Sequence, residues 1–140
     1  MTNHLEDVKI NVKIKLSVLW LSGEVTLLTF LVLEFMEQGV IQEIIAGNMR
    51  GLQLGPETLL FYAVMLLTPL VMAFLSLTLK DSVNRWANII LGAFLAVIYL
   101  GDLIAHLANP YAYAMLMGIA AVVAQALIIW YAWKWPKQEG

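Results

Sequence analysis

The chain has 140 residues, of which 61% are hydrophobic and only 13% are charged. Its mean hydropathy is +0.81, and a soluble core of this size could not bury so much apolar surface, which excludes an ordinary soluble domain. Cysteine is absent, which excludes disulfides, thiolate nucleophiles and cysteine metal sites. The formal net charge of −2 is too small to indicate a nucleic-acid partner.

Four apolar stretches follow one another along the chain, joined by short connectors. They cover residues 16–36, 58–79, 86–108 and 111–133. About 20 helical residues cross a hydrocarbon core of ~30 Å, so each stretch is long enough to span a bilayer. The first stretch is too long for the apolar region of a cleaved signal, and we expect it to be retained. The sequence therefore predicts an all-α integral membrane protein, with residues 1–140 forming one domain of four transmembrane helices.

The distribution of basic residues predicts the orientation. With four spans, both termini and the connector between the second and third spans share one side of the membrane, and seven of the eight basic residues lie there. These residues are Lys9, Lys13, Lys15, Lys80, Arg85, Lys134 and Lys137. Only Arg50 lies on the other side. By the positive-inside rule, the N and C termini are expected in the cytoplasm.

The short connectors carry signals for helix starts. Asp81 or Ser82 can cap the third span. Asn109 followed by Pro110 predicts a cap with proline in the first turn of the fourth span. Because that link is tight, the last two spans must be antiparallel neighbours, and we expect a bundle with up-down-up-down packing.

Two segments outside the spans have patterns of their own. In the first external connector, residues 37–55, apolar residues at helical spacing predict a short interfacial helix, and the glycines at its end predict a loop. Residues 8–16 alternate strictly between apolar and polar, which is typical of a half-buried strand. Since no second strand is evident, we favour a cytoplasmic extension of the first helix whose lysines reach the headgroups. A strand shared between two copies is the alternative.

Small side chains at a spacing of four predict where the helices pack, because they let two backbones approach closely. They are Asn88, Gly92 and Ala96 on the third span, and Ala114, Gly118, Ala121 and Gln125 on the fourth. Whether these faces meet within one copy or between copies is open from the sequence. We expect a homo-oligomer, because four short helices often need a partner to enclose a polar path.

Glu24 is the most informative polar residue inside a span. It lies eight residues into the first stretch, about 12 Å deep at 1.5 Å per residue. A carboxylate at that depth must be protonated, paired or exposed to a wet cavity. Gln125 and Thr68 are expected at a similar depth. One interpretation is a structural clamp of these three side chains, and the other is a carboxylate that binds protons or a ligand.

Tyr99, Asp102 and His106 form a second polar group on the third span. Their spacings of three and four place them on one helix face. Such a stripe can relay protons, bind a cation or act as acid and base, and its structural alternative is an ion pair at the outer end of the bundle. The outer side also carries four acidic residues. None of the acidic or histidine side chains forms a metal-ligand motif, so we predict neither a metal nor another cofactor.

Three stretches carry a family resemblance. Residues 11–20, 84–90 and 130–135 resemble a family of small four-span prokaryotic membrane proteins that is catalogued only as a domain of unknown function. The resemblance implies a four-helix fold in a prokaryotic plasma membrane, and it implies no activity.

Three functional classes fit these residues. The first is a small transporter or channel-like, ligand-binding bundle in which Glu24 exchanges protons for a substrate; only the architecture is similar to that of the small multidrug exporters. The second is a membrane enzyme or lipid-binding protein that handles a small amphipathic or lipid-like ligand with Tyr99, Asp102 and His106. The third is a non-catalytic subunit or scaffold. We favour transport or ligand binding, because no motif of a nucleophilic enzyme is present.

Overall fold

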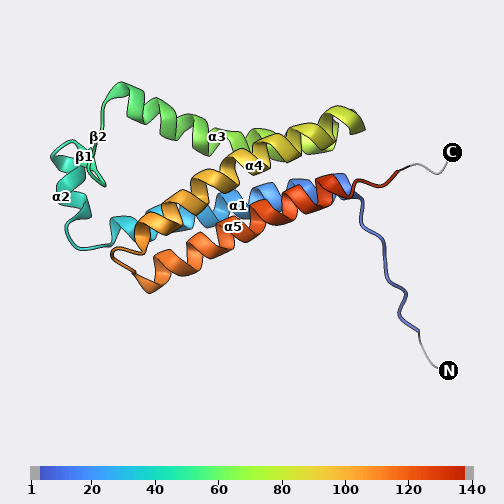
Figure 1. The fold of residues 1–140 in the computed structure, drawn as a ribbon, viewed down its shortest axis with the longest axis horizontal. Helices are drawn as coiled ribbons and strands as arrows, with labels where there is room; N and C mark the ends of the chain where they lie inside the picture. Colours follow the sequence, from blue (N-terminus) through green and yellow to red (C-terminus); the bar gives the residue numbers. More distant parts are fainter. Residues whose placement is uncertain (1–3, 138–140) are drawn as a thin grey trace.

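The computed structural model describes residues 4–137 and contains four long helices, one short helix and one small hairpin. In chain order they are α1 (Val12–Phe35), α2 (Val40–Ile45), β1 (Asn48–Met49), β2 (Leu52–Gln53), α3 (Pro56–Thr78), α4 (Asp81–His106) and α5 (Ala112–Trp133) (Figure 1). Each of the four long helices is long and apolar enough to cross a membrane. The predicted all-α bundle of four membrane-spanning helices is therefore confirmed, as is the short helix in the first connector.

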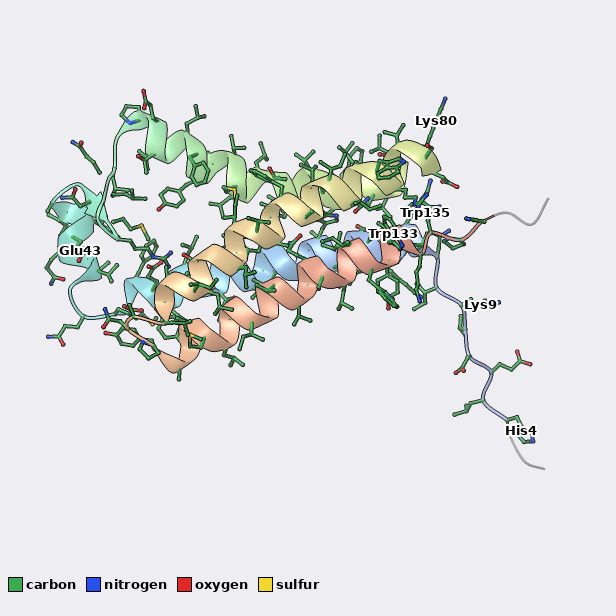
Figure 2. All side chains as sticks on the ribbon, in the orientation of Figure 1. His4, Lys9, Glu43, Lys80, Trp133 and Trp135 are labelled. Carbon is green, nitrogen blue, oxygen red and sulfur yellow. The ribbon has the colours of Figure 1, made fainter. Side chains whose placement is uncertain are left out.

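The two ends of the bundle differ in what they carry. Helix α2 and the β1–β2 hairpin lie at one end, which we call the hairpin end. The start of α1 and the end of α5 lie at the other, which we call the termini end (Figure 1). Lys80, Trp133 and Trp135 lie at the termini end and Glu43 lies at the hairpin end (Figure 2). The placement of the termini in the cytoplasm stays a prediction, because the fold alone does not orient the bundle in a membrane.

The helices pack unevenly around the bundle. Helix α1 packs along α3 and α5, and α5 packs along α4, whereas α3 and α4 touch only sparsely. Figure 1 shows α3 and α4 diverging from their shared turn toward the hairpin end. Large buried side chains fill the centre, among them Trp20, Met72, Leu95 and Ile128. The bundle is thus closed on three sides and less tightly joined between α3 and α4.

Gly92 and Gly118 mark two close approaches of α4 and α5. A Cβ atom placed on Gly92 would lie 3.1 Å from Ile129 Cγ1 and 3.3 Å from Ile128 Cγ2. At Gly118 of α5, a Cβ atom would lie 2.7 Å from Leu103 Cδ1. In lipid, no hydrophobic effect drives helices together. Close contacts of this kind supply van der Waals attraction, which favours their association instead. The predicted packing faces of these two helices therefore meet within one copy.

Two of the expected helix starts are different in the structure. Helix α4 begins at Asp81 with Lys80 at the N-cap position, and no side chain in the described part of the chain caps it. Helix α5 begins at Ala112, so Asn109 and Pro110 lie in the connection rather than in the first turn of the helix. Proline disfavours a helical conformation in the residue before it, and Tyr111 is also extended, with φ −77° and ψ 130°. The connection between α4 and α5 therefore ends two residues later than the sequence predicted.

The N-terminal segment contains no strand within residues 4–11. Asn11 accepts a hydrogen bond from the backbone N–H of Lys13 at 2.8 Å, so it caps α1, which begins at Val12. The strand interpretation of residues 8–16 was wrong. The helical extension was right from residue 12 onward, because the Asn11 cap prevents the helix from starting earlier.

The β1–β2 hairpin was not predicted. It pairs Asn48 with Gln53 and Met49 with Leu52. Its two turn residues both have positive φ, 51° at Arg50 and 76° at Gly51, as the tight turns of two-residue hairpins require. Arginine is an unusual residue for such a turn, which is why the sequence pattern did not indicate one.

Candidate functional site

Glu24 lies at the centre of the bundle and is almost fully buried, with 3% of its surface exposed. Its Oε2 atom has no hydrogen-bond partner among residues 4–137. Charged groups at this depth of a membrane protein are rare, and they are normally paired or placed against a wet cavity. Glu24 is therefore a carboxyl group whose free oxygen can take up a proton or a ligand atom.

Gln125 of α5 is at the same level of the bundle. Its Nε2 atom lies 3.7 Å from the position that a Cβ atom would take on Gly23, the neighbour of Glu24 in the chain. Gln125 is 1% exposed, and its Oε1 atom, like Glu24 Oε2, is without a hydrogen-bond partner in the described part of the chain. Two unsatisfied buried acceptors on facing helices are unusual, since buried polar atoms are nearly always hydrogen-bonded.

Thr68 does not join this pair. Its hydroxyl donates a hydrogen bond of 2.7 Å to the carbonyl of Val64, one turn earlier in the same helix. Of the three side chains in the clamp interpretation, Thr68 therefore bonds its own backbone instead of Glu24 or Gln125.

Tyr99 lies on α4, one helical turn before Asp102 and on the same helix face. It is 8% exposed. Tyr99 and Asp102 line a small cavity of about 30 Å³, which we call the core cavity and which also touches Thr26, Phe30 and Gly118. A space of this size with polar atoms on its wall can hold a water molecule.

A larger cavity of about 830 Å³, which we call the hairpin cavity, opens at the hairpin end. Asp102 lies on the wall of both cavities. The charged residues on its wall are Glu34, Glu37, Glu43, Arg50, Asp102 and His106. Four carboxylates face one guanidinium there, so the cavity attracts cations.

Arg50 joins two of these carboxylates. Its Nε atom donates a hydrogen bond to Glu34, and its Nη1 atom donates one of 2.7 Å to Asp102 Oδ1. The guanidinium also lies over the ring of Phe30, 5.1 Å from the centroid. Burial alone would lower the pKa of Arg50, but the bond to Glu34 and the charges of Glu34 and Asp102 outweigh it, so the pKa is raised. Arg50 therefore stays charged.

His106 completes the polar stripe of α4 that the sequence predicted. Its Nδ1 atom lies 2.8 Å from the backbone carbonyl oxygen of Asp102 and 3.5 Å from Asp102 Oδ2. Its ring contacts Phe30 edge to face, with the centroids 5.6 Å apart. Asp102 thus faces Arg50 on one side and His106 on the other.

The termini end of the bundle is sealed by hydrogen bonds. Asn88 Oδ1 accepts bonds from Trp20 Nε1 at 2.7 Å and from Ser76 Oγ at 3.2 Å, and Asn88 Nδ2 donates to Asn84 Oδ1 at 2.7 Å. Trp20, Ser76, Asn84 and Asn88 are fully buried. We call these four residues the termini seal. Trp20 precedes Glu24 by one helical turn, so the seal lies directly between Glu24 and the termini end.

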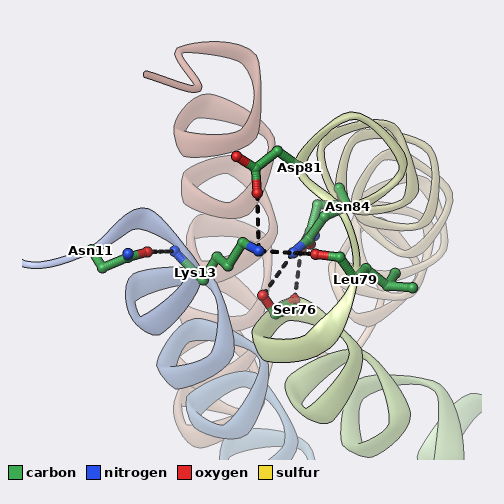
Figure 3. Close-up of polar contacts among 7 residues, drawn as sticks. Asn11, Lys13, Ser76, Leu79, Asp81 and Asn84 are labelled. Atoms are coloured by element: carbon green, nitrogen blue, oxygen red, sulfur yellow. Dashed lines mark hydrogen bonds and ion pairs between the residues drawn. The ribbon is translucent and has the colours of Figure 1, made fainter. Parts of the chain in front are cut away.

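The helix ends around the seal are also joined. Asn84 Nδ2 donates to the carbonyl of Ser76 at 2.7 Å, and Lys13 Nζ reaches both the carbonyl of Leu79 and Asp81 Oδ1 at 2.9 Å (Figure 3). These contacts fix α1 against the turn between α3 and α4. The polar groups of the bundle are therefore asymmetric, with cavities between Glu24 and the hairpin end and bonded side chains between Glu24 and the termini end.

Several residues of the site were not predicted from the sequence. Glu34, Arg50 and Phe30 were not recognised as a group, because they meet only when the connector folds back over the bundle. Asn84 and Asn88 left a clearer signal, since two amides four residues apart in an apolar helix need partners. In residues 4–137, no group of three or more histidine, aspartate or glutamate side chains is arranged to hold a metal ion.

Comparison with known proteins gives a family. A family model described as a family of unknown function (DUF6326) matches residues 5–140 of the chain. No curated protein and no solved structure matches the chain. The predicted resemblance to a domain of unknown function is thereby confirmed, whereas the prokaryotic origin stays a prediction.

Proposed function

The chain belongs to DUF6326, a family of unknown function, and we propose that it is a small transport protein in which Glu24 binds and releases protons. In this proposal the protein spans the plasma membrane of a prokaryote with both termini in the cytoplasm, so that the hairpin end faces outward. Protons reach Glu24 from outside through the hairpin cavity and the core cavity.

The observation that carries the proposal is the free Oε2 atom of a carboxyl group that is 3% exposed. A glutamate that only holds helices together would be expected to bond both of its oxygens to neighbouring groups. A carboxyl group that exchanges protons must instead keep an oxygen available. The free Oε1 atom of Gln125 at the same level supports this, because a protonated Glu24 has an acceptor on the facing helix.

The placement of the other polar groups supports a route to Glu24 from the hairpin end alone. Asp102 lines both cavities, and Tyr99 lines the core cavity one helical turn closer to the termini end. Tyrosine and aspartate side chains, together with a water molecule, are groups that pass protons between sites. The termini seal interrupts the route on the other side of Glu24.

Transport requires the termini seal to open in a second conformation, and α3 is the element whose movement would open it. Helix α3 supplies Ser76 to the seal, contacts α4 only sparsely and contains Pro69 in its interior. Proline removes one hydrogen bond of the helix ladder and lets a helix bend at that point. A bend at Pro69 would carry the Ser76 end of α3 away from Asn88.

Proton flux into proteoliposomes tests the proposal. The purified protein is reconstituted with a pH-sensitive dye inside, and an ion gradient with an ionophore sets the membrane potential. We expect the wild type to carry protons, Glu24→Gln to lose the flux at least tenfold and Glu24→Asp to retain part of it. The matched control is Glu57→Gln, which removes an exposed carboxylate at the start of α3.

A second measurement separates loss of function from loss of fold. Dicyclohexylcarbodiimide modifies protonated carboxyl groups in apolar surroundings, and mass spectrometry locates the product. We expect Glu24 to be modified more slowly as the pH rises and Glu57 to remain unmodified. If Glu24→Gln is folded by circular dichroism and its flux equals that of the wild type, Glu24 is not the proton-binding group and the scaffold interpretation replaces transport.

A further inference from the structure

Arg50 occupies a box of two carboxylates and one aromatic face. Its guanidinium is bonded to Glu34 and to Asp102, and it lies 5.1 Å from the centroid of the Phe30 ring. A planar guanidinium suits this box, because its fork of N–H groups matches carboxylates and its face stacks on an aromatic ring. The box is therefore a recognition site for this chemical group, and one of the chain's own side chains fills it.

The backbone of Arg50 is strained in the hairpin turn that carries the side chain. Arg50 has φ 51° and is the one non-glycine residue within 4–137 with a positive φ. Residues other than glycine avoid this region, and such strain gathers at ligand clamps and switch segments. The hairpin that carries Arg50 consists of two strands of two residues each. Arg50 is therefore carried into the box by a short hairpin whose turn has an unfavourable backbone conformation at Arg50.

The charge around the box exceeds what Arg50 neutralises. Glu34, Glu37, Glu43 and Asp102 line the hairpin cavity together with Arg50. Glu34 is 4% exposed, and its Oε2 atom has no hydrogen-bond partner in the described residues. A site built only to hold Arg50 would be expected to balance its charges and satisfy both oxygens of the buried carboxylate. The cavity wall therefore keeps a surplus of negative charge, which favours a cationic ligand.

We propose that the hairpin cavity binds an organic cation with a guanidinium or amidinium group, which displaces Arg50 from the box formed by Glu34, Asp102 and Phe30. Arg50 is a tethered internal competitor that keeps the box filled while the ligand is absent. The cavity volume of about 830 Å³ lies within the range of ~300–1,000 Å³ that is typical of small-molecule sites. His106 and Tyr111 on its wall offer further flat surfaces to the ligand.

This binding site goes beyond the proposed proton transport and does not depend on it. The ligand touches Glu34 and Asp102 at the hairpin end, and Glu24 lies ten residues before Glu34 in the same helix, which is ~15 Å at 1.5 Å per residue. Absence of proton flux would therefore leave the binding proposal standing, and absence of binding would leave the flux proposal standing.

Calorimetric titration of the detergent-purified protein with phenylguanidinium chloride tests the proposal. We expect saturable binding to the wild type, and binding to Arg50→Gly that is at least tenfold tighter because the competitor is removed. Glycine is the right replacement, since it takes the positive φ of position 50 without strain. Tetramethylammonium chloride has the same charge without the N–H fork, and we expect it to bind at least tenfold more weakly.

Two further variants make the result decisive. Arg50→Gly combined with Asp102→Asn is expected to lose the gain in affinity. Arg85→Ala, which removes an arginine that stacks on Trp86 and Trp133 at the termini end, is expected to bind like the wild type. Wild-type protein without saturable binding, equal affinity of wild type and Arg50→Gly, or equal binding of tetramethylammonium would each make the box a structural clasp and overturn the proposal. If Arg50→Gly does not fold, weakened binding to Asp102→Asn alone supports the proposal and unchanged binding overturns it.

Discussion

Trp20 and Asn88 meet at the buried centre of the termini seal, where Trp20 Nε1 donates to Asn88 Oδ1 at 2.7 Å. The two residues lie on α1 and α4, and the same oxygen of Asn88 accepts a bond from Ser76 of α3 at 3.2 Å. One amide oxygen therefore holds three helices together. Both side chains are 0% exposed, so no solvent is available to replace either bond.

Replacing Asn88 by alanine is expected to destabilise the bundle by about 1–2 kcal/mol, because it leaves the buried Trp20 N–H and Ser76 hydroxyl without their acceptor. Unfolding of the detergent-solubilised protein, followed by circular dichroism, measures the change. Trp20→Phe removes the donor together with part of the buried ring, and the double variant completes the cycle. Strictly additive effects of the two substitutions would contradict a direct bond between the two side chains.

The tight contact at Gly92 predicts that a leucine substitution destabilises the protein more there than at another glycine of α4. Gly92→Leu places a side chain where Ile128 and Ile129 already lie within 3.3 Å of a Cβ position, so α4 and α5 must separate. We expect a loss of at least 2 kcal/mol in the free energy of unfolding, as for severe overpacking. Gly101→Leu is the matched control on the same helix, since no atom of residues 4–137 lies within 4 Å of its Cβ position. Equal effects of the two substitutions would show that α4 and α5 do not pack as described.

The fold was predictable because the bilayer imposes a simple rule on length and hydropathy. All four apolar stretches became long helices, and the first connector formed its short helix. The errors lie at the ends of elements, where single residues decide. The Asn109–Pro110 pair read as a helix start, but the chain stays extended through Tyr111. The Asn11 cap, by contrast, was a local signal that the alternation of residues 8–16 obscured.

The site was only partly predictable, for a physical reason that differs between residues. Glu24, Gln125 and the stripe of α4 stood out because polar groups in apolar helices are costly. Thr68 stood out for the same reason, but its hydroxyl donates a hydrogen bond to the Val64 carbonyl. An ionised carboxylate has no proton to donate and cannot make such a bond. The contacts of Arg50 with Glu34 and Asp102 depend on how a loop folds over the bundle, which no helical periodicity encodes.

The orientation of the bundle is directly measurable, because the chain has no cysteine of its own. Glu43→Cys at the hairpin end and Lys80→Cys at the termini end give two single-cysteine variants (Figure 2). With the termini in the cytoplasm, a membrane-impermeant maleimide should label the cysteine at position 43 in intact cells. It should label position 80 only after the cells are permeabilised. The reverse pattern would place the hairpin cavity inside the cell and refute the positive-inside assignment.

Lys13 of α1 holds the turn between α3 and α4 against the bundle. Its ammonium group bonds the Leu79 carbonyl and Asp81, both at 2.9 Å, and Asp81 is largely exposed, so the pair contributes only about 1 kcal/mol. Lys13→Met should therefore open the turn locally without unfolding the bundle, and amide hydrogen exchange around residues 79–84 should accelerate about fivefold. Lys9→Met is the matched control, because Lys9 is exposed and precedes the helix. If both variants leave exchange at the turn unchanged, the Lys13 contacts do not hold α1 to it, and the bonds of Asn84 to the Ser76 and Leu79 carbonyls are sufficient to close the turn.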